Sequence, residues 1–287
     1  MPYRPRRSVL YMPGANARAL EKAKSIDADC LILDLEDSVA PDKKAEARGQ
    51  VAAAVAAGGY GKREIIIRIN GLFTGWGAED MEMAAKAGPD AVLVPKLNDV
   101  NDLANAARFL VKAGGGGKTH LWAMIETPLS IFNLKEMVAS HEATGLQCVV
   151  LGTNDLAKDM RASSGGGRMA LVPALTMAVL AAHAFGLDAI DGVYNDIKDE
   201  AGFSVECEQG RMLGMDGKTL IHPGQVATCN VVFSPSEAEI VWANKVVSAF
   251  NLSENAGKGV ILVEGRMVER LHLAMAERVM AIAEAIA

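Results

Sequence analysis

The chain has 287 residues, of which 50% are hydrophobic and only 5% are aromatic, and its formal net charge is −6 at pH 7. This length suits one α/β barrel with an appendage, and the composition argues against a disordered chain or an aromatic-rich β-sandwich. An acidic chain lacks the clustered Lys and Arg that displace counterions from nucleic-acid phosphates, so we expect no nucleic-acid partner.

The cysteines and the hydropathy pattern bear on the cellular compartment. Cys30, Cys148, Cys207 and Cys229 are widely spaced and form no C-x-x-C pair, so the sequence predicts no disulfide framework and a reducing cytoplasm. The start of the chain, MPYRPRR, is basic, but no long apolar run follows it. We therefore expect a cytoplasmic protein without a membrane partner.

Short apolar runs alternate with amphipathic stretches along most of the chain, and this alternation predicts parallel strands joined by crossover helices. Clear helical periodicity is present at residues 15–26, 43–57 and 172–185. Eight βα units indicate a closed (β/α)8 TIM barrel. Its strands are expected at residues 8–13, 30–36, 64–70, 91–96, 121–127, 147–155, 188–193 and 218–223.

The end of the chain extends beyond these eight units. A helix is expected at residues 234–251, with Ser234 as its N-cap and Pro235 at its first position, followed by a short hairpin and a last helix within residues 258–287. We therefore predict a catalytic barrel at residues 1–251. Residues 252–287 are expected to form a C-terminal lid or oligomerisation extension that packs on a neighbouring subunit.

Polar side chains recur where the predicted strands end, and a barrel gathers these ends around one mouth, where active sites of this fold are built. Any one of them could be a structural ion pair or a loop anchor. Their recurrence favours a bound ligand or metal, because many unpaired buried charges would be costly. The residues are Glu36, Asp37, Arg68, Asn70, Lys96, Glu126, Asn154, Asp155, Asp191 and His222.

This set mixes several carboxylates with one Arg, one Lys and one His, and oxygen ligands select a hard cation such as Mg²⁺. The chain has five histidines, none at H-x-H or H-E-x-x-H spacing, so a zinc site is poorly supported. The SSGGG segment at residues 163–167 follows the sixth predicted strand and is either a mobile flap over the mouth or a long loop.

Several motifs together resemble the citrate lyase β-subunit, malyl-CoA lyase and citramalyl-CoA lyase group of the HpcH/HpaI aldolase/citrate lyase family. The resemblance runs in order over nearly the whole chain. The motifs are RRSVLYMPGANARALEKA, DLEDSVAPDKKAEAR, IIIRINGLFTGWGAED, VLVPKL, AMIETPLSI, LGTNDLAKDM, AIDGVYNDIKD and GKTLIHPGQV.

The resemblance implies that Glu126 and Asp155 are the protein ligands of Mg²⁺ and that Arg68 is the substrate arginine. Two strand-end carboxylates suit this metal, and the planar guanidinium fork suits substrate oxygens and developing negative charge. Glu36 and Asp37 are expected to order metal-bound water or Arg68.

The resemblance also implies contacts to the acyl-CoA. Tyr11, Arg18 and Lys22 match positions that touch the CoA moiety in relatives, although a solvated helix face is the ordinary interpretation of the last two. The strand-eight segment that contacts ligand in relatives corresponds to Ile221 and His222, and Asn154 is a further substrate-binding candidate beside Asp155.

The tail departs from the family pattern. Relatives carry Gly-x-Met-[Ile/Val]-Asp-x-Pro, whose Asp completes an adjacent subunit's site as the acid/base, whereas this chain has Glu269 at the Asp position and Leu271 at the Pro position. Glu keeps the carboxylate and adds a methylene, which changes the reach on which proton transfer depends. A tail that serves a neighbour implies a homotrimer or a hexamer built from trimers.

The resemblance thus implies a Mg²⁺-dependent carbon–carbon lyase of the oxo-acid-lyase type, acting by Claisen chemistry. It would cleave or form a β-hydroxyacyl-CoA, of the malyl-CoA or citramalyl-CoA type, to an acyl-CoA and an α-oxo acid such as glyoxylate, pyruvate or oxaloacetate. Two alternatives stay open. The protein could be a malyl-CoA thioesterase. It could also be a citrate-lyase-like subunit that acts with an acyl-carrier partner, or a scaffold that has lost catalysis.

Overall fold

The computed structural model describes residues 3–163 and 167–287 and confirms the predicted barrel. Eight parallel strands pair in sequence order, and the eighth pairs with the first to close the sheet. The strands are β1 (Ser8–Pro13), β2 (Cys30–Asp34), β3 (Glu64–Arg68), β4 (Ala91–Val94), β5 (His120–Ile125), β6 (Leu146–Leu151), β7 (Asp188–Asp191) and β8 (Gly217–Leu220).

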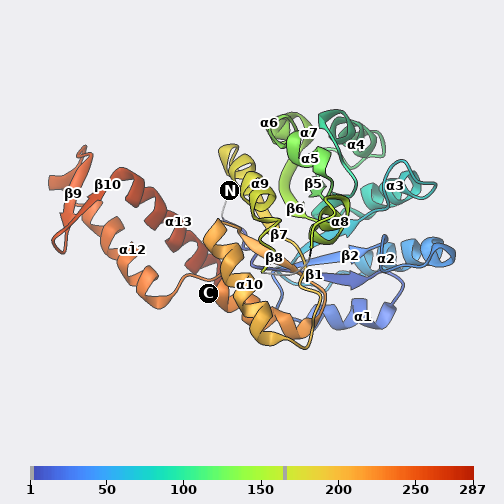
Figure 1. Cartoon of the computed structure of the whole chain (residues 1–287), viewed down its shortest axis with the longest axis horizontal. Helices are drawn as coiled ribbons and strands as arrows, with labels where there is room; N and C mark the ends of the chain where they lie inside the picture. Colours follow the sequence, from blue (N-terminus) through green and yellow to red (C-terminus); the bar gives the residue numbers. More distant parts are fainter. Residues whose placement is uncertain (1–2, 164–166) are drawn as a thin grey trace. The chain divides into compact units, whose positions relative to one another are not determined.

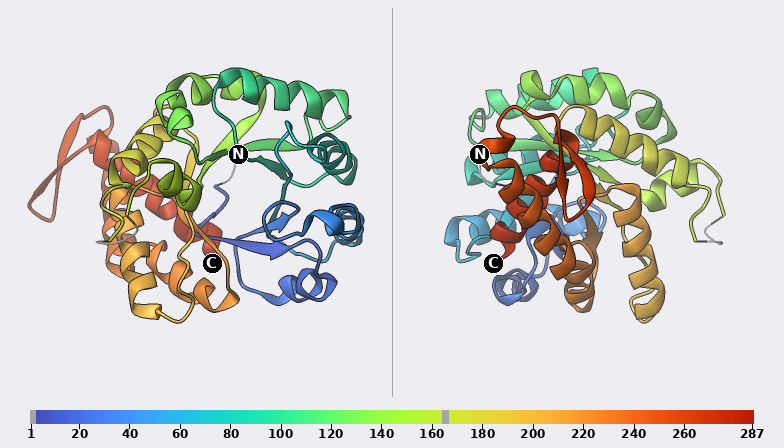
Figure 2. Two further views of the ribbon diagram at one scale, coloured as in Figure 1. Left: turned by 45° about the vertical axis from the view of Figure 1, so that its right-hand side comes forward. Right: turned by 90° about the vertical axis from the view of Figure 1, so that its left-hand side faces the viewer.

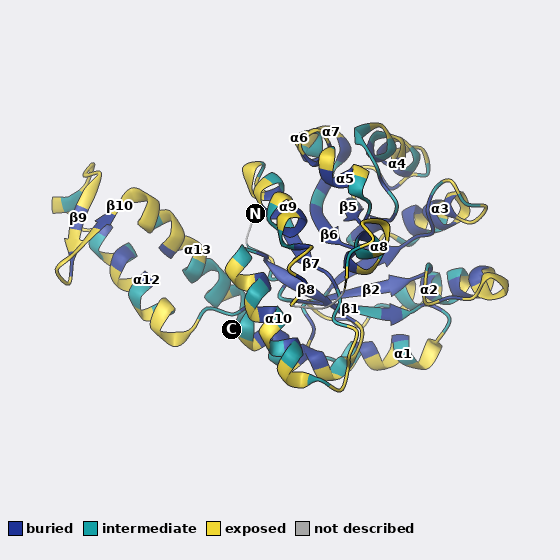
Figure 3. Ribbon diagram, in the orientation of Figure 1, coloured by how far each residue is buried: buried dark blue, intermediate teal, exposed yellow. Residues whose placement is uncertain are grey.

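Helices connect successive strands on the outside of the barrel (Figures 1 and 2). In Figure 3 the barrel strands and the inner faces of the surrounding helices are coloured as buried, and exposed residues lie on the outer helix faces. The helices are α1 (Ala17–Lys22), α2 (Lys44–Ala57), α3 (Gly77–Ala87), α4 (Val100–Lys112), α5 (Pro128–Phe132), α6 (Leu134–Ala139), α7 (His141–Thr144), α8 (Thr153–Asp159), α9 (Val172–Ala184), α10 (Glu200–Leu213), α11 (Val226–Val232), α12 (Glu237–Phe250) and α13 (Arg270–Ile286). None of these is long and apolar enough to cross a membrane.

Several strands end earlier than the sequence predicts. The clearest case is β6, which ends at Leu151, whereas the prediction extends to Asp155. The N–H of Gly152 still bonds to the carbonyl of Ile125, and the chain then turns directly into α8. Asp155 therefore lies in the first turn of a helix. The predicted strand is too long because an apolar run followed by polar residues does not distinguish a longer strand from the start of the next helix.

Inward-facing strand residues fill the barrel with an apolar core that includes Ile32, Ile66, Leu93 and Trp122. The end of the barrel where the strands begin is closed by a buried charge. Arg6 donates to both carboxylate oxygens of Glu64, each at 2.8 Å, and to Asp188 Oδ2 at 2.8 Å. Its guanidinium carbon lies 4.9 Å from the centroid of the Trp122 ring. The acidic groups and the aromatic face together stabilise this cation.

Of the described residues, 3–5 and 231–287 form a second compact unit, and those between 6 and 230 form the barrel unit. The predicted hairpin is confirmed as β9 (Val260–Val263) paired antiparallel with β10 (Arg266–Glu269), and α13 follows it. The prediction divides the chain between residues 251 and 252, whereas here α12 groups with the tail. Its apolar residues pack with those of the hairpin and α13, including Val246, Phe250, Ile261, Val263, Val268 and Ala276.

The N-cap of α12 also differs from the prediction. Ser236, two residues beyond the expected Ser234, accepts from the N–H of Glu239, and Glu239 Oε2 accepts from the N–H of Ser236 at 2.7 Å. This capping box fixes the first turn, so Pro235 precedes the helix instead of starting it.

The Arg6 cluster generates a test of stability. Replacing Arg6 with Met would remove the cation that contacts the buried Glu64 and the half-buried Asp188, so we expect the free energy of unfolding to fall by about 3–5 kcal/mol. Urea titration followed by circular dichroism measures the change. Arg108→Met, at an exposed site on α4, is the control and should change stability by less than about 0.5 kcal/mol. A loss below about 1 kcal/mol for Arg6→Met would contradict a stabilising role for the cluster.

Candidate functional site

Arg68, the last residue of β3, is fixed by the last residue of the neighbouring strand β2. Asp34 and Arg68 are register partners, and the guanidinium donates from Nε to Asp34 Oδ1 at 2.6 Å and from Nη2 to Oδ2 at 2.7 Å. Burial alone would raise the pKa of Asp34, but Arg68 and N–H donors from Glu36 and Ser38 outweigh it and lower that pKa. The pair is therefore ionised and rigid.

The remaining nitrogen of Arg68 faces further acidic groups. Nη1 lies 3.0 Å from Glu36 Oε2 and 3.3 Å from Asp37 Oδ2. The Glu36 oxygen is buried, and its ion pair with Arg68 lacks hydrogen-bond geometry. Burial raises the pKa of Glu36 to about 8, with Arg68 opposing the shift and the Asp37 carboxylate adding to it. Glu36 therefore holds a proton through much of the neutral range.

Tyr11 packs against the same arginine from β1. The Arg68 guanidinium carbon lies 4.7 Å from the centroid of its ring, and the buried phenol oxygen has no hydrogen-bond partner among the described residues. Burial raises the pKa of Tyr11 despite the nearby cation, so the hydroxyl stays protonated and can donate. A buried donor without a partner is costly in the free protein. A ligand oxygen is a natural acceptor for this hydroxyl.

Glu126 and Asp155 converge on one cation, the ammonium group of Lys96. Lys96 Nζ lies 3.3 Å from Glu126 Oε2 and forms an ion pair with Asp155 Oδ2. The backbone N–H of Lys96 also donates to Glu126 Oε1 at 2.7 Å. Burial raises the pKa of Glu126 and Lys96 only partly opposes it, whereas Asp155, which is more exposed, has its pKa lowered because Lys96 outweighs its burial.

Gly152 makes room for one of these carboxylates. A Cβ atom at position 152 would lie 2.4 Å from Glu126 Cβ and 2.9 Å from Glu126 Oε2. Only glycine permits this approach between the end of β6 and the side chain from the end of β5.

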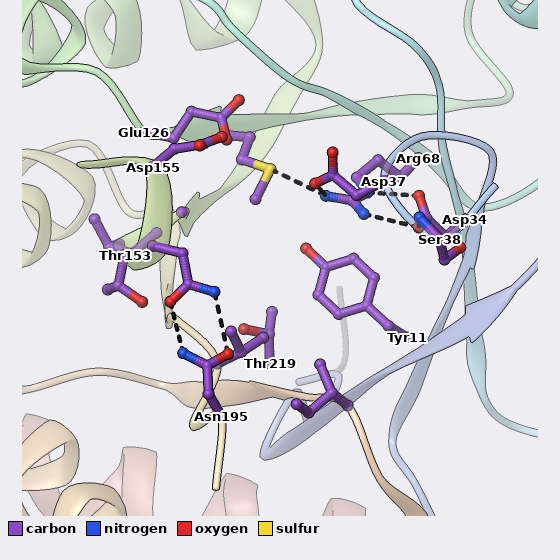
Figure 4. A pocket seen from close by; sticks show the side chains of 16 residues that line it. Tyr11, Asp34, Asp37, Ser38, Arg68, Glu126, Thr153, Asp155, Asn195 and Thr219 are labelled. Carbon is purple, nitrogen blue, oxygen red and sulfur yellow. Dashed lines mark hydrogen bonds and ion pairs between the residues drawn. The ribbon is translucent and has the colours of Figure 1, made fainter. Parts of the chain in front are cut away.

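These groups surround one cavity of about 330 Å³ at the mouth of the barrel. Figure 4 shows Tyr11 and Arg68 beside the cavity with Glu126 and Asp155 across from them. An amide pair lies on another side, where Asn154 and Asn195 each donate a side-chain N–H to the other's oxygen at 3.1 and 2.8 Å. The cavity thus combines two carboxylates, a guanidinium, a phenol and amide groups.

The structure brings most of the predicted site residues together. Seven of them line the cavity: Tyr11, Asp37, Arg68, Glu126, Asn154, Asp155 and Ile221. Glu36 contacts Arg68 at the edge of this group. Arg18 and Lys22 are exposed on α1 and do not line the cavity, and His222 is exposed with its Nδ1 accepting from the N–H of Gly224 at 3.1 Å. Their roles toward CoA stay predictions.

Two further predictions concern residues elsewhere. Glu269 is exposed at the end of β10 in the smaller unit, where its N–H donates to His272 Nδ1 at 3.0 Å, and its role stays a prediction. Of the SSGGG segment, residues 164–166 lie outside the described residues.

The prediction that Asp191 lies at the barrel mouth is wrong. Its carboxylate accepts two hydrogen bonds from Arg168 at 2.7 and 2.8 Å and one from Lys218 at 3.0 Å, and Lys218 also contacts Glu206 on α10. Side chains alternate along a strand, so Ile190 points into the barrel core and Asp191 points outward. This cluster is a structural ion network between the sheet and a helix.

Sequence reasoning missed some residues that the cavity uses. The pattern of polar residues at strand ends does not single out Asp34, because Leu35 prolongs the apolar run beyond it. A carboxylate inside an apolar run is nevertheless a signal that the chain provides a specific partner for it. Asn195 and Thr219 also line the cavity, and neither carries a distinctive sequence signal.

The donor set fits a magnesium ion. Mg²⁺ is usually held by one or two protein carboxylates and completes its octahedron with water and substrate oxygens. Glu126 and Asp155 already share one cation position. In residues 3–163 and 167–287 no group of three or more His, Cys, Asp or Glu side chains is placed to hold a metal ion.

The buried Glu36 generates a pH prediction. Its folded-state pKa of about 8 lies above the ordinary value of 4.5, so folding binds a proton and stability falls as pH rises from 4.5 towards 8. In Glu36→Gln this contribution is absent. We expect the stability of the wild type relative to this variant to decline over that window, by at most about 1.4 kcal/mol per pH unit. Urea titrations in EDTA at several pH values measure it. A difference that is constant with pH, or that grows as pH rises, would rule the assignment out.

Comparison with known proteins agrees with this geometry. The family model described as HpcH/HpaI aldolase/citrate lyase matches residues 7–223. A (3S)-malyl-CoA thioesterase of Cereibacter sphaeroides is 47% identical over 283 residues, covering 99% of this chain and 96% of that protein. The citrate lyase subunit beta of Escherichia coli is 36% identical over 271 residues, covering 93% and 89%.

A solved structure of the protein CitE from Mycobacterium tuberculosis, in complex with magnesium, acetoacetate and coenzyme A, aligns with a TM-score of 0.77. It is 27% identical and covers 96% of this chain and 97% of that one. Sequence, fold and cavity agree, and the chain belongs to the HpcH/HpaI aldolase/citrate lyase family of enzymes.

Proposed function

We propose that the protein is a Mg²⁺-dependent lyase that cleaves or forms the carbon–carbon bond of a malyl-CoA- or citramalyl-CoA-type β-hydroxyacyl-CoA. One observation carries the proposal. Glu126 and Asp155 converge on a single cation position in the cavity that the clamped guanidinium of Arg68 also lines. The ligands named for the mycobacterial relative, magnesium, acetoacetate and coenzyme A, support a metal, a small oxo acid and CoA.

The chemistry in the cleavage direction begins with a base that takes the proton of the β-hydroxyl group. The electron pair of that O–H bond forms the carbonyl of the α-oxo acid, and the pair of the broken carbon–carbon bond passes to the acyl-CoA as an enolate. The enolate carbon then takes up a proton. A bound Mg²⁺ would act as a Lewis acid on the oxo-acid oxygens. Arg68, which cannot turn away from Asp34, offers fixed positive charge to the acid.

Glu269 of a neighbouring chain is the proposed base. It is exposed, and the surface around it is apolar: Leu262 and Met267 are directly opposed in the hairpin and are 74% and 68% exposed. Leu271 and Met275 add a further exposed pair one turn apart on α13. Exposed apolar groups of this kind favour a subunit interface. They support the proposed homotrimer or hexamer, in which each tail would serve the site of another barrel.

Thioester hydrolysis is the second candidate function. A specific observation favours it, because the relative named (3S)-malyl-CoA thioesterase is 47% identical over nearly the entire length of both chains. Hydrolysis would attack the thioester carbonyl with water and release free CoA, leaving the carbon skeleton intact. The same metal, arginine and CoA contacts would bind the substrate in either reaction.

The two reactions differ in their products. Purified protein with Mg²⁺ and (3S)-malyl-CoA should release glyoxylate and acetyl-CoA if it is a lyase, and malate and free CoA if it is a thioesterase. We expect Glu126→Gln and Asp155→Asn each to lower turnover by about 10³-fold or more, because each removes half of the protein's metal ligands. Asp159→Asn, at an exposed site one turn further along α8, is the matched control and should leave the rate within about twofold.

The products identify which of the candidate functions the protein has. Free CoA without α-oxo acid would replace the lyase with the thioesterase. Turnover that appears only when the acyl group is carried on an acyl-carrier protein would select the citrate-lyase-like subunit. A panel of malyl-, citramalyl- and citryl-CoA with no product of any kind would remove both enzymatic readings for CoA substrates.

Sharing of the site between chains has its own test. Glu269→Gln and Glu126→Gln should each be inactive alone, because one lacks the base and the other lacks a metal ligand. If each site joins one chain's barrel to another's tail, a trimer that contains both variants has one site in three with an intact barrel and an intact tail. Such trimers should recover about a third of the wild-type rate, and hexamers that contain both variants about a quarter. Coexpression of two tagged variants with tandem purification gives the mixture. No recovery, or a monomer by light scattering, would contradict the shared site.

A further inference from the structure

Lys96 is the cation that the two proposed metal ligands share in this structure. Its ammonium group lies 3.3 Å from Glu126 Oε2 and pairs with Asp155 Oδ2. The side chain of Lys96 is partly open to solvent, with 31% of it exposed. The inference below rests on the proposed metal site, and it concerns what Lys96 does there.

The backbone of Lys96 has a separate role. Its φ angle is 58°, in the left-handed region that side chains other than glycine rarely adopt. In this conformation the Lys96 N–H donates to Glu126 Oε1 at 2.7 Å. Glu126 is therefore held by the backbone of the β4–α4 connection, while the side chain of Lys96 supplies the charge. The side chain can leave without releasing the carboxylate from its backbone donor.

Two cations cannot occupy this position together. Mg²⁺ binds carboxylate oxygens at about 2.0–2.1 Å and needs their lone pairs directed at it. In the structure, the lone pairs of Glu126 Oε2 and Asp155 Oδ2 are directed at the ammonium group of Lys96. Without any cation, the two carboxylates would repel each other in a partly buried site.

We propose that Lys96 is a positioning residue that takes the place of the divalent cation in the metal-free protein and leaves when that cation binds. Its ammonium keeps Glu126 and Asp155 turned toward each other, so the site is formed before the metal arrives. A metal ion binds only to molecules in which the ammonium group has left the site. The apparent affinity for the metal is therefore the intrinsic affinity multiplied by the fraction of such molecules. Lys96 thus sets the metal concentration at which the site fills.

The experiment measures metal binding directly and needs no turnover. The full-length protein, stripped with EDTA and free of substrate, is titrated with Mn²⁺ and followed by electron paramagnetic resonance. Lys96→Met keeps the bulk of the side chain and removes its charge. We expect its dissociation constant for Mn²⁺ to fall by about tenfold, which corresponds to an ammonium in place in roughly nine of ten metal-free molecules.

A matched control separates occupancy from general electrostatics. Lys158 is exposed on α8 three residues beyond Asp155 and acts on that carboxylate only through its charge. Lys158→Met should tighten Mn²⁺ binding by less than about twofold, because exposed charges are screened. Lys96→Arg keeps the positive charge and should bind Mn²⁺ no more tightly than the wild type.

A second readout uses thermal stability. Metal-free Lys96→Met should melt at a lower temperature than the wild type, because its two carboxylates lose their cation, and saturating Mn²⁺ should raise its melting temperature by more. Metal binding that is unchanged or weaker in Lys96→Met would overturn the inference alone. Absence of Mn²⁺ binding by the wild type would overturn the proposed metal site and the inference with it.

Discussion

The bidentate pair between Asp34 and Arg68 is the interaction on which the cavity depends. It places a guanidinium at the mouth of an apolar barrel, where an unpaired charge would be very costly. Because the two residues are register partners on adjacent strands, the sheet itself fixes the direction of the arginine. The Tyr11 ring and Glu36 are then arranged around a cation that has no freedom to turn.

The acidic groups of the cavity respond to this environment in opposite directions. Burial raises the pKa of Glu36 and of Glu126, whereas the pKa of Asp34 and of Asp155 is lowered because each has a close cationic partner. One small space therefore holds carboxylates whose pKa values are shifted in opposite directions. Such a division is typical of sites that bind cations and move protons.

The sequence predicts the barrel, the hairpin and most of the cavity, because strand ends in this fold converge wherever the apolar runs stop. It fails where side-chain direction matters. Asp191 and Ile190 are consecutive, yet one lies in an ion network outside the sheet and the other in the core. The pairing of Lys96 with Glu126 and Asp155 joins three different βα units, and no local pattern in the chain encodes it.

Gly152 contributes no chemical group to the cavity, yet a methyl group there would overlap the Glu126 side chain. Because residue 152 has no side chain, the ends of β5 and β6 approach each other closely enough for the Glu126 carboxylate to lie between them. Sequence divergence is therefore restricted at a residue that takes no part in the chemistry of the site. The chemistry of the mouth can vary through its loops, but a lineage that acquires a side chain at residue 152 must rebuild the anionic wall from another strand.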